Sequence, residues 1–186
     1  MNNLVKRTAA GNHEANAADA PLSHQFLAFT LAGEMYAVGL LRVREIIGFA
    51  PLTEVPMMPP FIRGVINLRG AVVPVIDLAV RFGHQPCKIQ RRTCIVIIEV
   101  HQDDDIQNIG IMVDAVSEVL DVAASDIENP PSFGARIRSD FIAGMCRSGD
   151  GFVIILEIQR VLSVDEMAML VSVGETGGKT GGNLVV

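Results

Sequence analysis

The side chains that most often perform catalysis or bind metals are scattered along this chain. The four histidines, His13, His24, His84 and His101, fall in segments whose pattern predicts tails or connectors. No cysteine or carboxylate cluster joins them at the spacing of a zinc site or of a nucleophile and its base. The three aspartates at 103–105 lack the glycine and the distal glutamate of a calcium loop. We therefore expect no enzymatic activity, no cofactor and no bound metal.

The three cysteines, Cys87, Cys94 and Cys146, cannot all be paired with one another. Cys94 and Cys146 lie in apolar runs typical of strands, where a free thiol behaves as a small hydrophobic side chain. This use of cysteine is typical of a reducing, cytosolic compartment. No apolar run approaches the ~18 residues of a membrane helix, and the N-terminus lacks the apolar core of a signal peptide. We expect a soluble, cytoplasmic protein without direct membrane insertion.

Two arginines and one glutamate lie where a partner could meet them. Arg69 occupies the predicted tip of a hairpin, and Arg63 lies just before that hairpin. An ordinary surface arginine and a guanidinium presented to a partner explain this placement equally well. Glu45 lies between the apolar Val43 and Ile47, which fits either a plain solvent face or a mixed apolar and charged contact patch.

The hairpin that would present these arginines extends from Phe61 to Leu78 and reads FIRGVINLRGAVVPVIDL. Two β-branched runs flank a glycine-containing turn, which is typical of a pair of antiparallel strands. The second run is apolar on both faces, as in a strand that is covered on both sides. Pro74 cannot donate a backbone hydrogen bond, so we expect that point of the strand to lie at a sheet edge or a bulge.

The same stretch recurs 80 positions later, without a gap, as FIAGMCRSGDGFVIILEI. Its first residue, Phe141, aligns with Phe61. An earlier segment repeats too, because the run 43–47 matches the run 116–120 and an alternating strand precedes each of them. Glu118 in the second copy matches Glu45, which slightly favours a scaffold role for both. The sequence therefore predicts two copies of one small unit.

Alternating and β-branched runs predict ten strands, in two sets of five. The run 40–47 is ambiguous, because it also satisfies a helical period. Each set spans about 60 residues, and five short strands of that size close into a small barrel through twist and bulges. A barrel so small is marginal alone, so we expect the two to share a core. The first barrel is expected over 25–83 and the second over 92–157.

Helices and tails complete the predicted mainly β fold. Asp77 can cap a short helix over 78–82 that ends at Gly83. A capping box that begins at Ser163 predicts a C-terminal helix over 163–172. Residues 1–24 are polar and unpatterned and residues 173–186 are rich in glycine, so we expect both segments to be disordered.

A nucleic-acid-binding double β-barrel is the alternative, because small barrels can bind single strands. Such a protein needs aromatic and cationic side chains on one strand face. This chain has a net charge of −6, eight phenylalanines, one tyrosine and no tryptophan. These properties argue against a binder of the phosphate backbone, and we expect no nucleic acid among the partners.

The runs described above resemble the CheW-like domain of chemotaxis coupling proteins. The pattern NLRG-x-x-x-P-x-x-D-L, which starts at Asn67, is specific for this domain type. The resemblance covers about 25–171. It rests on the segments 26–31, 36–38, 43–46, 61–70, 73–78, 110–116 and 165–170. The longer N-terminal tail and the glycine-rich end depart from the family pattern.

The resemblance implies two five-stranded SH3-like barrels and a non-catalytic adaptor in the cytoplasm, at clusters of chemoreceptors. The implied partners are the cytoplasmic tip of methyl-accepting chemoreceptors and the regulatory domain of the chemotaxis histidine kinase CheA. The matching motif positions implied to affect partner binding are Val43, Glu45, Gly64 and Arg69. Their neighbours complete the expected partner-binding set, which adds Ile46, Arg63 and Asn67.

Overall fold

The computed structural model describes residues 23–102, 105–130 and 137–163. The expected disordered tail over 173–186 lies outside these residues, and so does the expected C-terminal helix over 163–172 apart from Ser163. The expected N-terminal tail over 1–24 also lies outside them, except for its last two residues, which begin the first strand.

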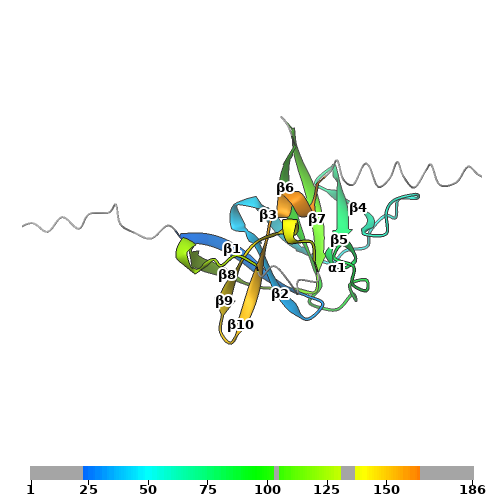
Figure 1. The fold of residues 1–186 in the computed structure, drawn as a ribbon. Coiled ribbons are helices and arrows are strands. Elements are labelled where there is room, and N and C mark those ends of the chain that lie inside the picture. Colours follow the sequence, from blue (N-terminus) through cyan, green and yellow to red (C-terminus); the bar gives the residue numbers. More distant parts are fainter. Residues whose placement is uncertain (1–22, 103–104, 131–136, 164–186) are drawn as a thin grey trace, which may run out of the picture.

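Two five-stranded sheets build the described part of the chain, and the expected mainly β fold is confirmed. The first sheet has the order β8-β1-β2-β10-β9. Its strands are β1 (Ser23–Leu31), β2 (Glu34–Gly39), β8 (Ala115–Ala123), β9 (Ile142–Ser148) and β10 (Gly151–Leu156). The second sheet has the order β3-β6-β7-β5-β4. Its strands are β3 (Val43–Gly48), β4 (Ile62–Leu68), β5 (Ala71–Asp77), β6 (Cys94–Gln102) and β7 (Asp105–Val113). Figure 1 shows the first sheet below and to the left of the second.

The expected division into a first barrel over 25–83 and a second over 92–157 is wrong. β1 pairs with β8 and β2 pairs with β10, so the hairpin formed by β1 and β2 pairs with strands from the second half of the chain. The hairpin of β6 and β7 likewise joins β3 and β5. The chain changes sheets after each of these two hairpins, at the short 3-10 helix Leu40–Arg42 and at Asp114. A repeat shows that two units are alike, but not whether each closes on itself or exchanges its hairpin.

The repeat itself is visible in matching local structure. The helices α1 (Leu78–Arg81) and α2 (Ile158–Val161) each follow the last strand of a unit, and their first residues lie 80 positions apart. The backbone N–H of Asp77 donates to the carbonyl oxygen of Phe61 at 2.7 Å, and that of Glu157 donates to Phe141 at 2.8 Å. Two further 3-10 helices, Ala124–Asp126 and Ser139–Phe141, lie in the second copy. The ambiguous run 40–47 is a 3-10 helix followed by β3.

The two sheets share one large core, as expected from their size. Leu27, Phe29 and Leu31 of β1 pack in it with Ile98 and Ile111 of the second sheet. Smaller apolar clusters lie within each sheet, and Phe26 of β1 belongs to one of them. Alternate residues of β1 therefore face two different apolar clusters, which is why both faces of this strand are apolar.

Pro74 lies at the middle of β5, and Asp77 is the last residue of this strand, where the hairpin ends. β5 is an interior strand, whereas Pro74 was expected at a sheet edge or a bulge. Its pairing with β7 begins only at Val75, so the missing N–H of Pro74 removes no bond from that ladder. The fully buried Asp77 caps α1, as predicted, by accepting from the N–H groups of Ala79 and Val80 at 3.1 and 3.3 Å.

Candidate partner-docking site

Glu45 and Arg69 meet between an edge strand and a hairpin tip. Glu45 lies on β3, which forms one edge of the second sheet, and Arg69 lies in the turn between β4 and β5. The Nη2 of Arg69 donates to the Oε2 of Glu45 at 3.0 Å. The two side chains are 80% and 25% exposed, respectively. Exposed pairs of this kind contribute only about 0–1 kcal/mol to stability, so the pair does little to hold the fold together.

The turn presents Arg69 on a defined backbone. Arg69 and Gly70 both have positive φ, at 53° and 91°. Positive φ at both central residues is typical of the two-residue type I′ hairpin turn. The Oδ1 of Asn67 accepts a hydrogen bond from the N–H of Gly70 at 2.8 Å. Asn67 therefore shapes the turn, and it positions Arg69 through the backbone.

A hollow of about 520 Å³ adjoins the pair of Glu45 and Arg69, and we call it the β3 groove. It is lined by Leu41, Val43, Arg44, Glu45, Leu68, Arg69, Ala71, Ile97, Glu99 and Asn108. Leu41 is 99% exposed at its rim. The lining thus combines aliphatic side chains with two arginines and two carboxylates, a composition that suits a protein contact.

Seven of the ten residues that line the groove were not in the predicted partner-binding set: Leu41, Arg44, Leu68, Ala71, Ile97, Glu99 and Asn108. The Nη1 of Arg44 pairs with the Oε2 of Glu99 at 2.9 Å, and the other carboxylate oxygen lies 3.0 Å from the Nε2 of His101. The buried Oδ1 of Asn108 has no hydrogen-bond partner among the described residues. Glu99 stands out in the sequence as a lone carboxylate in the apolar run 94–100, but no pattern marks Leu41 or Asn108.

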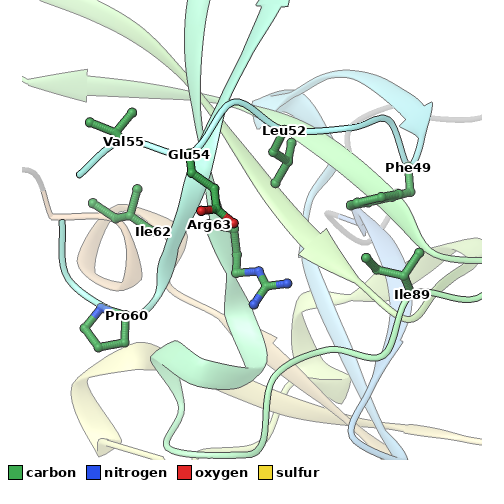
Figure 2. A pocket seen from close by; sticks show the side chains of 8 residues that line it. All are labelled: Phe49, Leu52, Glu54, Val55, Pro60, Ile62, Arg63 and Ile89. Carbon is green, nitrogen blue, oxygen red and sulfur yellow. The ribbon is translucent and has the colours of Figure 1, made fainter. Parts of the chain in front are cut away.

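The remaining predicted residues do not line the β3 groove. Ile46 is 43% exposed on β3, and its neighbour Glu45 faces the groove, so Ile46 points to the other face of the strand. Gly64 is buried, with φ of 143°, and a Cβ there would lie 2.5 Å from the carbonyl oxygen of Thr53. Its role is therefore steric. Arg63 lines a different hollow (Figure 2).

The one strongly shifted thiol lies outside the groove. The Sγ of Cys87 donates to the Oδ1 of Asp114 at 3.0 Å. Burial, followed by the hydrogen bond and negative charge of Asp114, raises the pKa of Cys87 from 9.0 to about 12. A thiol that stays protonated is a poor nucleophile. Within the described ranges, no group of three or more histidine, cysteine or acidic residues could hold a metal ion.

The sequence matches a known domain family over most of its length. The family model for the CheW-like domain matches residues 25–166. A chemotaxis protein CheW of Klebsiella aerogenes is 35% identical over 155 residues, covering 83% of this chain and 91% of the relative. One of Rhizobium meliloti is 30% identical over 159 residues, covering 86% of this chain and 97% of the relative.

A solved structure extends the agreement to three dimensions. The crystal structure of the scaffolding protein TtCheW from Thermoanaerobacter tengcongensis has a TM-score of 0.70 and 33% sequence identity, and the match covers 81% of this chain and 94% of that one. No helix in the described ranges is long and apolar enough to cross a membrane. From the matched domain, the relatives and the shared fold, we conclude that the chain belongs to the CheW-like family of chemotaxis proteins.

Proposed function

We propose that the protein is a non-catalytic adaptor that couples chemoreceptors to the histidine kinase CheA. Membership of the CheW-like family and the names of the relatives, which are chemotaxis and scaffolding proteins, support this role. Its partners are then the cytoplasmic tip of the receptors and the regulatory domain of the kinase. The protein works in the cytoplasm, at the receptor clusters, where several weak contacts gain strength by being linked.

The β3 groove is the surface that we assign to one of these partners. The observation that carries the assignment is the guanidinium of Arg69, which is 80% exposed on a defined turn while its partner Glu45 borders aliphatic side chains. A partner carboxylate can bind the free N–H groups of Arg69, and apolar side chains can cover Leu41 and Val43. Ile46 lies on the other face of the same strand and can extend the contact around the sheet edge.

Calorimetric titration against two fragments tests the proposal. The fragments are the cytoplasmic tip of a receptor and the regulatory domain of the kinase. We expect Arg69→Glu to weaken binding of at least one fragment by tenfold or more, about 1.4 kcal/mol, and to leave the melting temperature nearly unchanged. Arg147→Glu is the matched control, because Arg147 is 75% exposed on β9 of the first sheet and lines neither this groove nor the hollow at Arg63.

Two results would oppose the proposal. Failure of the unchanged protein to bind either fragment at tens of micromolar would remove the adaptor role. A large drop in melting temperature for Arg69→Glu would make Arg69 a structural residue. The nucleic-acid alternative ranks lower, because Phe152 is the one aromatic among the exposed large hydrophobic residues that the structure describes, and a stacking platform needs several rings.

A further inference from the structure

A second hollow lies between the loop before β4 and the connector after α1 (Figure 2), and we call it the Arg63 pocket. It encloses about 360 Å³ and is lined by Phe49, Leu52, Glu54, Val55, Pro60, Ile62, Arg63 and Ile89. It shares no lining residue with the β3 groove. The two hollows can therefore be occupied and tested separately.

The Arg63 pocket combines a largely polar surface with six apolar lining residues. Phe49 and Leu52 are partly buried and pack against the inner cluster of the second sheet, so their positions are fixed by the core. Ile89 is 54% exposed on the opposite side, and Met57 and Met58 are exposed on the loop next to the pocket. Methionine adapts its shape to different partners and is common at binding surfaces. These side chains can cover an apolar group of a ligand.

Arg63 is a half-buried cation without a partner. No hydrogen bond or ion pair of its guanidinium is found among the described residues, and none joins it to Glu54 of the same pocket. Arg69 and Arg44 of the β3 groove, in contrast, each bind a carboxylate, at 3.0 and 2.9 Å. Figure 2 shows the Arg63 guanidinium extending away from Leu52 and Val55, into the space between Pro60 and Ile89. A guanidinium that borders a hollow and has no carboxylate partner can bind an anionic group there.

The connector that carries Ile89 adds positive charge at the rim. Lys88, Arg91 and Arg92 are all exposed, and the run 83–93 contains no acidic residue. This local excess contrasts with the net charge of −6 for the whole chain. Exposed lysines and arginines of this kind attract acidic segments at a distance and speed their association.

We propose that the Arg63 pocket docks an acidic peptide segment of a partner protein. A carboxylate of the segment binds the Arg63 guanidinium, and a neighbouring apolar side chain packs between Phe49 and Ile89. Glu54 lies at the same pocket and disfavours a ligand that is purely anionic, which is why an apolar anchor is part of the assignment. This contact is separate from the β3 groove and does not depend on the proposed adaptor function.

The test uses the full chain, with isoleucine methyl groups labelled with carbon-13 for NMR. The probe is a capped hexapeptide of glycine, leucine, glutamate, leucine, glutamate and glycine, in buffer of low ionic strength so that charge is little screened. Ile62 and Ile89 report on the Arg63 pocket, and Ile97 reports on the β3 groove. We expect the methyl signals of Ile62 and Ile89 to shift with added peptide and that of Ile97 to stay.

Matched variants and probes complete the design. Arg63→Gln is expected to weaken peptide binding by about tenfold or more, because a charged acceptor loses its donor, and to leave the melting temperature unchanged. Arg69→Gln is the control and is expected to bind the peptide as the unchanged protein does. The same peptide with glutamine in place of glutamate is expected to bind at least about tenfold more weakly.

Four outcomes would overturn the proposal. They are the absence of shifts, shifts at Ile97 in place of Ile89, equal binding by Arg63→Gln, and tighter Arg63-dependent binding of a six-nucleotide single-stranded DNA than of the peptide. The last outcome would make the pocket a phosphate site. None of these results bears on whether receptor and kinase fragments bind the β3 groove, so the two proposals can fail separately.

Discussion

Arg81 donates a hydrogen bond from its Nε to the carbonyl oxygen of Val161 at 3.1 Å. The two residues end α1 and α2 and lie 80 positions apart, so they are counterparts in the repeat. The carbon of the Arg81 guanidinium also lies 5.1 and 4.9 Å from the ring centres of Phe61 and Phe141, which are counterparts as well. The two copies therefore meet around one cation that only the first copy supplies.

We predict that Arg81→Met lowers the free energy of unfolding by about 2 kcal/mol. Methionine keeps most of the apolar stem but loses the hydrogen bond and the contacts of the cation with two rings. Urea unfolding of the two proteins measures the difference. Arg92→Met is the control, because Arg92 is exposed, and it is expected to change stability by less than about 0.5 kcal/mol. An equally small change for Arg81→Met would show that the sheets do not depend on this cation.

We predict that Gly64→Ala lowers the free energy of unfolding by about 2 kcal/mol or more. The methyl group would lie 2.5 Å from the carbonyl oxygen of Thr53, at a φ of 143°. Backbone cannot move aside as a flexible side chain can, and a non-glycine residue is strained at this φ. Gly39→Ala is the control, since nothing lies within 4 Å of its added Cβ. Thermal unfolding of both variants decides, and equal stability would refute the steric role of Gly64.

The repeat predicted the local structure better than the pairing of strands. A loop packs against the motif glycine in both copies. An alanine Cβ at Gly144 would lie 2.5 Å from the side chain of Ile127, and one at Gly64 would lie 2.5 Å from the carbonyl oxygen of Thr53. Strand positions and the helix cap at Asp77 depend on residues that are close in sequence, so they can be predicted from the sequence alone. The exchange of hairpins depends on which sheet the chain enters after residue 39 and after residue 113. No local sequence pattern predicts this.

The site was predictable where one strand and one turn supply it. Val43, Glu45 and Arg69 were predicted and line one groove. Asn108 was not, because it lies on β7, which joins this sheet only through the exchange of hairpins. Arg63 was assigned to the same set as Arg69 because they are near in sequence, but the two arginines line different hollows. Two residues that are close in sequence were therefore predicted to share a site, although the fold places them in different hollows.

We predict that the protein loses stability above pH 9 partly through Cys87. Burial and Asp114 raise the pKa of the folded thiol from 9.0 to about 12, so the folded state favours the protonated form. The stabilisation is complete below the unfolded pKa and is lost as the pH rises through that of the folded state. Urea unfolding at pH 7.5 and 10.5 measures the loss. Cys87→Ser keeps a hydroxyl donor for Asp114 but does not titrate here, so it is expected to lose less stability between these pH values. An equal loss in both proteins would exclude a contribution from Cys87.

We predict that Arg69→Asn stabilises the protein and weakens partner binding. Arg69 has a φ of 53°, which asparagine adopts more readily than arginine, and Asn-Gly is the preferred pair in a type I′ turn. The expected gain in free energy of unfolding is about 0.5 kcal/mol, because the exposed pair with Glu45 is worth little. Binding of the receptor or kinase fragment is expected to fall, because the guanidinium is lost. Opposite signs for the two effects would mean that Arg69 is kept for recognition at some expense of stability. A loss of stability would instead mean that its ion pair with Glu45 supports the hairpin, and urea unfolding beside calorimetry on the same samples distinguishes these results.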